Sequence, residues 1–143
     1  MTQAFDHLAT TYDNNFTYSV LGRWLRNVVH NRLATHFNTG SYVLELGCGT
    51  GEDAQWLAQK GVNIWATDSS TAMLNVAKEK NRDMGNIQFA HLDLHHPQLP
   101  ASAPESFDGV FANFGPINVL EDTHSLAQWL AQYIKSGGRA CFG

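Results

Sequence analysis

A strand-like segment that runs into closely spaced glycines constrains the fold of this chain more than any other feature. Residues 42–46, YVLEL, are apolar and rich in strand formers, and GCGTG follows at once. The next residues begin with the acids Glu52 and Asp53 and end with Lys60 and Gly61, the charge and glycine pattern of a helix. Glycine permits positive φ and lets a ligand approach the main chain closely. The segment therefore predicts the first strand, turn and helix of a parallel α/β fold.

The rest of the chain continues this alternation of strand and helix. Strand patterns occupy residues 62–68, 86–93, 106–115 and 137–143. Helix patterns occupy residues 20–37, 69–82 and 121–135. Alternating strands and helices favour parallel pairing through right-handed crossovers, so we expect an α/β fold with helices layered on a sheet.

Composition argues against several classes of protein. A chain of 143 residues, 43% hydrophobic, is long enough for one domain but short for two. The net charge is -4 and the nine basic residues are scattered, so we expect no nucleic acid and no membrane as partner. A signal-like start and a long apolar run are both missing from the sequence, which favours a cytoplasmic location. The two cysteines and seven histidines show no ligand spacing, so no metal site is expected.

Two acids lie near the carboxyl ends of the predicted strands, where a parallel sheet binds its ligands. Asp68 ends the second strand, and an ionised carboxylate there can accept both hydroxyls of a ribose. The alternative role for Asp68 is a cap on the helix that follows. Glu45 lies inside an apolar strand, where an acid must be paired or solvated at a site. The two acids together predict a ligand that contains a nucleoside.

The charge of the glycine turn indicates which nucleoside is favoured. The dinucleotide fingerprint GxGxxG needs a glycine where this chain has Glu52, and Asp53 follows. A phosphate about 4 Å from one of these acids would meet a repulsion of about 4 kcal/mol at a surface-like dielectric. S-adenosylmethionine carries a sulfonium and an ammonium group and no phosphate. The acids therefore favour it over a nicotinamide dinucleotide.

Five segments in order between Tyr42 and Gly143 resemble a known family. VLELGCGTG, ATDSSTAML, FAHLDL, FDGVFANFG and IKSGGRACFG resemble the successive motifs of class I S-adenosylmethionine-dependent methyltransferases, and the opening FDHLATTYD is similar to the start of their small-molecule, UbiE-like branch. The resemblance implies a Rossmann-like, doubly wound parallel sheet of order 3-2-1-4-5 in a three-layer α/β/α fold with N-terminal helices. It also implies one methyltransferase domain over residues 1–143, made of a helical cap, 1–40, and a cofactor-binding core, 41–143, that ends after the fifth strand without the family's C-terminal β-hairpin.

The resemblance places a site for S-adenosylmethionine, with S-adenosylhomocysteine as the product, along the carboxyl ends of the strands. Glu45 and the backbone of residues 47–49 would face the methionyl end, Gly51 would let the turn enter its helix, and Asp68 would hold the ribose. The predicted cofactor-binding residues are Tyr12, Glu45, Gly47, Cys48, Gly49, Gly51, Asp68, Ser69, Met73, Asp93, Leu94, Asn113 and Phe114.

The adenine end of the site is implied in the same way. Ser69 and Met73 would flank the adenine, although a place in the core suits Met73 equally well. Asp93 and the main chain of Leu94 would read the adenine edge, unless Asp93 caps the turn before the proline-rich loop.

Residues near the transferred methyl group are the least determined by the sequence. Asn113 and Phe114 would lie beside the sulfonium, and Tyr12 would either close over the cofactor or pack the N-terminal segment. His91, His124 and Tyr12 are conceivable general bases, but nothing in the sequence brings one within hydrogen-bond reach of a substrate. We therefore assign no catalytic residue from the sequence.

The expected reaction is methyl transfer to a small-molecule acceptor by in-line displacement. Residues 113–116, NFGP, lack the Pro-Pro-aromatic core typical of methyltransferases that act on nucleobase amino groups, which argues against a DNA acceptor. The alternatives are a non-catalytic or degenerate cofactor-binding domain and, disfavoured by the turn, a nicotinamide-dependent oxidoreductase. The open edge of the fifth strand favours a homodimer unless more chain follows. The acceptor itself is not identified by the sequence.

Overall fold

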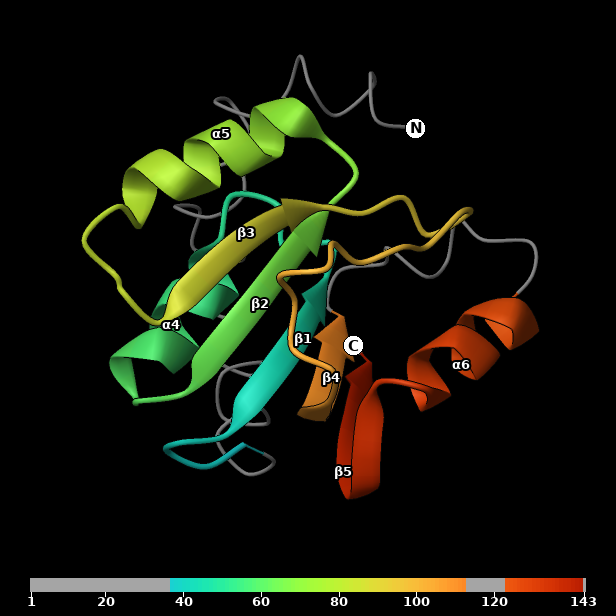
Figure 1. The fold of residues 1–143 in the computed structure, drawn as a ribbon. Helices are drawn as coiled ribbons and strands as arrows, with labels where there is room; N and C mark the ends of the chain where they lie inside the picture. Colours follow the sequence, from blue (N-terminus) through green and yellow to red (C-terminus); the bar gives the residue numbers. More distant parts are fainter. Residues whose placement is uncertain (1–36, 113–122, 143) are drawn as a thin grey trace.

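The computed structural model describes residues 37–112 and 123–142, and these residues contain a five-stranded parallel sheet (Figure 1). Its strands are β1 Tyr42–Leu46, β2 Asn63–Asp68, β3 Ile87–His91, β4 Phe107–Ala112 and β5 Ile134–Phe142. The helices are α4 Glu52–Gln59, α5 Thr71–Lys80 and α6 Thr123–Ala131. The order across the sheet is β3-β2-β1-β4-β5, which confirms the predicted order. The N-terminal helices predicted from the sequence lie outside the described residues.

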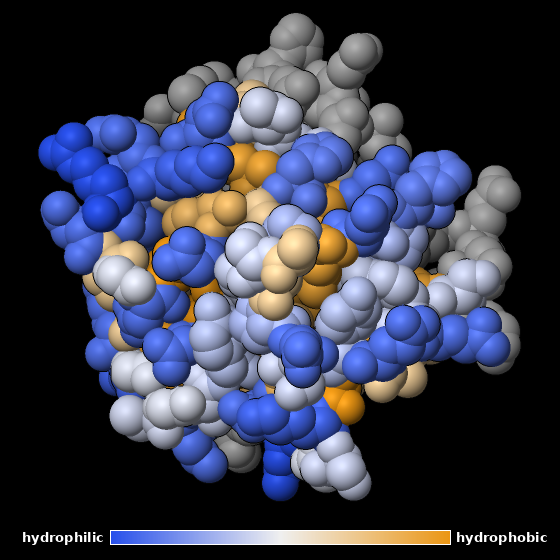
Figure 2. All heavy atoms as spheres, viewed as in Figure 1, coloured by the Kyte–Doolittle hydropathy of each residue, from blue (hydrophilic) through white to orange (hydrophobic). Residues whose placement is uncertain are grey.

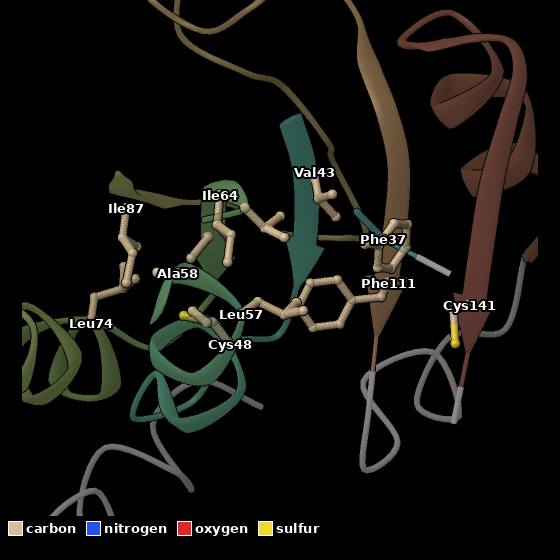
Figure 3. Close-up of a cluster of buried hydrophobic side chains, with 13 residues drawn as sticks. Phe37, Val43, Cys48, Leu57, Ala58, Ile64, Leu74, Ile87, Phe111 and Cys141 are labelled. Carbon is tan, nitrogen blue, oxygen red and sulfur yellow. The ribbon is translucent and has the colours of Figure 1, made fainter. Parts of the chain in front are cut away.

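Two hydrophobic clusters attach helices to the two faces of the sheet. On one face, Leu57 of α4 and Leu74 of α5 pack with Ile64 of β2 in a cluster that Figure 3 shows. On the other face, Leu126 of α6 packs in a second cluster that contains Leu44 of β1. Each fully buried side chain of this kind stabilises the fold by about 1.5–3 kcal/mol. Helices on both faces of one sheet make the three-layer α/β/α arrangement that was predicted.

The connection from β3 to β4 runs across the α6 face of the sheet (Figure 1). Its apolar residues Leu92 and Leu99 are buried in the second cluster, so the loop covers sheet surface in place of a helix. In the same view, Figure 2 shows hydrophilic side chains around most of this face and apolar surface near its centre. No helix within the two described ranges is long and apolar enough to cross a membrane.

The structure corrects one predicted boundary, between the last helix and the last strand. The helix predicted over 121–135 ends earlier, and the strand predicted from residue 137 begins earlier. The Tyr133 amide donates to the Leu130 carbonyl, three residues back, at 2.9 Å, which is a tight turn that ends the helix. The Phe107 amide then donates to the Tyr133 carbonyl at 2.6 Å. Two apolar residues that continue the helical spacing are therefore part of the sheet's hydrogen bonding and not of α6: Tyr133 accepts from Phe107, and Ile134 begins β5.

Candidate functional site

The glycine turn lies at the carboxyl end of β1, and three of its glycines have left-handed backbone. Their φ angles are 68° at Gly47, 55° at Gly49 and 82° at Gly51. A Cβ built on Gly51 would lie 2.9 Å from Asn81 Nδ2 and 3.1 Å from Ala77 Cβ, so this glycine lets the turn pack against α5. A Cβ on Gly49 would meet nothing within 4 Å among the described atoms, so the space beside Gly49 is open to a ligand.

The main-chain amides of the turn are used inside the protein. The Cys48 amide donates to the Thr67 carbonyl of β2 at 2.7 Å, and the Gly51 amide donates to the Cys48 carbonyl at 2.9 Å. The Gly49 amide donates to Asp68 Oδ2 at 2.8 Å. A phosphate is held by converging N–H groups, and these three are already engaged. These three amides are therefore not available to hold a phosphate.

Asp68, the last residue of β2, ties the glycine turn to the start of α5. Its Oδ2 accepts the Gly49 amide and its Oδ1 accepts the Ser70 amide, each at 2.8 Å. The N-cap of α5 is Ser70, whose hydroxyl accepts the Met73 amide at 3.2 Å, so Ser70 and not Asp68 caps the helix, while Asp68 accepts the Ser70 amide in the turn before it. An ionised carboxylate has about four lone-pair sites, so Asp68 can still accept hydrogen bonds from ribose hydroxyls.

Burial and hydrogen bonding act in opposite directions on Asp68. Burial raises the pKa of the Asp68 carboxyl above its ordinary value of 3.8, and the amides of Ser70 and Gly49 partly offset this rise. A positive charge on His91 also lowers the pKa of Asp68. The hydrogen-bond donors therefore stabilise the ionised Asp68 carboxylate, while burial destabilises it.

The remaining acids give the turn a negative potential. Glu45 is buried in β1 with 2% exposure, beside the turn. Burial raises the pKa of the Cys48 thiol well above its ordinary value, and the charges of Glu45 and then Asp68 raise it further. At the start of α4, Asp53 is buried, and Glu52 Oε2 lies 3.0 Å from Lys80 Nζ. A cationic ligand would be favoured beside this group of acids.

The residues predicted for the adenine lie on the turns after β2 and β3 and, for Met73, in the first turn of α5. Met73 is buried with 4% exposure, which suits both of the roles considered for it. Asp93 does cap a turn, because its Oδ1 accepts the His95 amide at 2.9 Å and its carbonyl accepts the His96 amide at 3.0 Å. Leu94 packs against the second hydrophobic cluster. A hollow of about 460 Å³, open to solvent, lies beside them and is lined by residues 90–93, 96 and 98–100.

The structure brings most of the predicted site residues to the carboxyl edge of the central strands. Those at the ends of β1, β2 and β3, on the turns that follow them or in the first turn of α5 are Glu45, Gly47, Cys48, Gly49, Gly51, Asp68, Ser69, Met73, Asp93 and Leu94. The three others, Tyr12, Asn113 and Phe114, lie outside the described residues. Within the described ranges, no three His, Cys, Asp or Glu side chains are grouped so as to hold a metal ion.

Sequence reasoning considered His91 only as a conceivable base and missed what it contacts. His91 ends β3 and lies opposite Asp68 in the parallel pairing of β2 with β3. Its Nε2 lies 3.1 Å from the Ser69 carbonyl oxygen. The signal in the sequence was that both residues end adjacent strands, since parallel strands of similar length bring such residues to the same edge.

The fold and this edge define a class of protein, a Rossmann-like α/β domain with a glycine turn and acids at the ends of its first two strands. A family model described as a methyltransferase domain matches residues 43–138. The chain belongs to this family of methyltransferase domains.

Three similar proteins place the chain within the family. A demethylmenaquinone methyltransferase of Clavibacter sepedonicus is 32% identical over 135 residues, which are 94% of this chain and 54% of that protein. The phosphoethanolamine N-methyltransferase 2 of Haemonchus contortus, in complex with S-adenosyl-L-methionine, has a TM-score of 0.78 at 28% identity and covers 97% of this chain and 33% of that chain. The [4+2]-cyclase SpnF shares the fold with a TM-score of 0.78 at 18% identity, over 96% of this chain and 56% of that chain. The chain spans about half the length of the curated relatives it matches.

Proposed function

We propose that the chain binds S-adenosylmethionine and transfers its methyl group to a small-molecule acceptor. The observation that carries the proposal is the glycine turn, where the amides of Cys48 and Gly49 are engaged internally while the carboxylates of Glu45 and Asp68 lie close by. Such a site offers acceptors and negative charge, which suit hydroxyl, ammonium and sulfonium groups. The S-adenosyl-L-methionine complex of the Haemonchus contortus enzyme supports the same ligand.

The proposal assigns residues to each part of S-adenosylmethionine. Asp68 would accept the ribose hydroxyls, and Glu45 with the carbonyls of the turn would receive the ammonium group. Ser69, Met73, Asp93 and Leu94 would enclose the adenine, since they lie in the turn after β2, at the start of α5 and in the turn after β3. The sequence motifs alone assign three further residues to the site, Tyr12, Asn113 and Phe114. The proposal also takes residues 1–143 as one methyltransferase domain.

When bound, S-adenosylmethionine would supply a methyl group that its sulfonium already activates. The remaining task of the chain is to hold the acceptor atom in line with that methyl at near-attack distance, and this positioning can supply several kcal/mol of the barrier, up to about 10. An acceptor that carries a proton must also lose it, and no described residue is assigned as the base.

A demethylmenaquinone-type acceptor is the first to test, because several similar curated relatives carry that name. A cytoplasmic location and the absence of nucleic-acid and membrane partners, expected from charge and composition, remain predictions alongside it.

Calorimetry with S-adenosylmethionine, S-adenosylhomocysteine and NAD tests the ligand. We expect saturable binding of the two sulfur nucleosides and none of NAD. Binding of NAD alone would support an oxidoreductase and overturn the proposal. Methyl transfer is then measured with radiolabelled S-adenosylmethionine and a panel of quinol, phenol and amine acceptors.

A non-catalytic cofactor-binding domain is the second candidate. Tight binding of S-adenosylhomocysteine without transfer to any acceptor would favour this candidate.

A further inference from the structure

His91 contacts the peptide group that orients Asp68. The side chain of His91 is exposed at the end of β3, an edge strand among the described residues, and its Nε2 lies 3.1 Å from the Ser69 carbonyl oxygen. A carbonyl oxygen only accepts hydrogen bonds, so this contact is a hydrogen bond in the forms of His91 that carry a proton on Nε2.

The Ser69 carbonyl and the Ser70 amide belong to one planar peptide unit. The carbonyl of that unit accepts from His91, and its N–H donates to Asp68 Oδ1 at 2.8 Å. Because the peptide is rigid, fixing its carbonyl also fixes the direction of its N–H. Two hydrogen bonds on one peptide also polarise each other and strengthen both.

The end of β3 holds this turn at a second point. The Leu92 amide donates to the Asp68 carbonyl at 3.0 Å, directly after the β2–β3 pairing in which Asp68 lies opposite His91. The turn after β2 is thus held at two successive residues. The Asp68 carbonyl accepts from the Leu92 amide, and the Ser69 carbonyl contacts the side chain of His91. A positive charge on His91 would also favour the ionised Asp68 carboxylate, since it lowers the pKa of that acid.

We propose that His91 is a positioning residue for the nucleoside, which acts by fixing the Ser69–Ser70 peptide and so the Asp68 carboxylate that accepts the ribose hydroxyls. This inference rests on the proposed function, because it assumes that Asp68 binds a ribose. It concerns ligand affinity and assigns His91 no contact with the reacting atoms.

The first test compares two replacements of His91 by calorimetry with S-adenosylhomocysteine. His91→Leu removes the donor, and His91→Gln retains an N–H that can reach the Ser69 carbonyl. We expect His91→Leu to weaken binding about fivefold, the value of one ordinary hydrogen bond, and His91→Gln to stay within about twofold of the unmodified chain. Gln88→Leu is the matched control, an exposed residue of the same strand, and should leave the affinity unchanged.

The second test asks whether His91 acts through Asp68. In an Asp68→Asn background, His91→Leu should cost almost nothing more, since the two residues act as one unit. An equal loss in both backgrounds would overturn the inference, as would unchanged affinity in the single variant. Failure of the unmodified chain to bind S-adenosylhomocysteine would overturn the proposed function as well. This outcome can be told apart from failure of the inference on His91 alone, in which the unmodified chain binds and the variants do not differ from it.

A third measurement tests, in the absence of ligand, how firmly the Ser69–Ser70 peptide is held. Amide hydrogen exchange at Ser70 should be faster in His91→Leu than in His91→Gln, because the Ser69–Ser70 peptide is then free to rotate. Equal exchange at Ser70 in two folded variants would overturn the proposed role.

Discussion

Asp68 is the residue at which the needs of folding and of ligand binding oppose each other. Its carboxylate is partly buried, and burial raises its pKa above 3.8, while the amides of Ser70 and Gly49 favour the ionised form. A raised pKa in the folded state means that the folded chain binds a proton more tightly than the unfolded chain. Ionised Asp68 therefore disfavours folding, yet the ionised form is the one that can accept both ribose hydroxyls.

This opposition predicts two pH dependences of opposite sign. As pH rises through the range above 3.8, the contribution of Asp68 to the free energy of unfolding should fall, whereas affinity for S-adenosylhomocysteine should rise. Denaturation and calorimetry across that range measure the two quantities. In Asp68→Asn both trends should flatten, and the affinity should drop at least about tenfold, since a charge-assisted hydrogen bond is lost. The same pH profile in Asp68→Asn would assign the titration to another group.

Two glycines of the turn should respond differently to alanine. Gly51→Ala meets Asn81 and Ala77 and forces alanine to φ 82°, so we expect a loss of about 2 kcal/mol in unfolding free energy. Gly49→Ala carries only the strain of φ 55° in open space, about 1 kcal/mol, but its methyl group enters the space proposed for the ligand. Its main effect should be on affinity for S-adenosylhomocysteine.

Chemical denaturation and calorimetry on both glycine variants separate these effects. Gly85→Ala is the control, because no neighbour lies within 4 Å of its Cβ among the described atoms and its φ is not positive, and it should change stability by less than about 0.5 kcal/mol. A Gly49 variant that binds normally would show that the ligand does not approach the turn.

At the scale of elements, Asp108 joins three strands. Its Oδ2 accepts the Tyr42 amide at the start of β1 at 2.8 Å, and its Oδ1 lies 3.2 Å from Lys135 Nζ of β5. The Tyr42 amide lowers the pKa of Asp108 most, burial opposes it, and Lys135 lowers the pKa further. The stability that Asp108 contributes is therefore present above pH 3.8 and is lost as the pH falls below that value.

Asp108→Ala should lower the free energy of unfolding by about 1 kcal/mol, because the Tyr42 amide loses its partner. Lys135→Ala is the matched comparison and should cost less than about 0.5 kcal/mol, since the ion pair is largely exposed. Urea denaturation of both variants near neutral pH checks this ranking. Equal losses would assign the effect to the ion pair instead.

The elements themselves could be predicted wherever the pattern was local. β1 matches the predicted strand YVLEL, because its apolar run is bounded by glycine. The end of α6 could not be predicted, because apolar residues continue the helical spacing through Tyr133 while a bond from the Phe107 amide, distant in sequence, takes its carbonyl into the sheet. Local periodicity carries no information about such a partner.

The same limit applies to the candidate site. The acids Glu45 and Asp68 could be chosen because their positions at strand ends are local facts of the sequence. The bond from the Gly49 amide to Asp68 and the contact of His91 with Ser69 depend on the register between strands, which no short segment determines. The sequence therefore predicted which acids lie near the strand ends, and the structure added the contacts that surround them.

At the scale of the whole molecule, the edge at β5 is the feature that bears on assembly. Among residues 37–112 and 123–142, no strand lies on the outer side of β5, and Arg139 and Ala140 of that strand are exposed. An uncovered strand edge offers unpaired N–H and C=O groups to another chain. We therefore expect the 143-residue chain to self-associate as concentration rises, measured by light scattering after size exclusion.

Two lysine substitutions decide whether β5 is the edge that pairs. Ala140→Lys places a charge on β5, as natural proteins do to block edge pairing, and should shift the chain toward monomer. Gln88→Lys places the same charge on β3, the opposite edge of the described sheet, and should leave association unchanged. A chain that stays monomeric at every concentration, or that responds equally to both substitutions, would exclude pairing through β5. In the former case the backbone groups of that edge must be satisfied by water or by chain outside the described residues, because unpaired groups buried from water are costly.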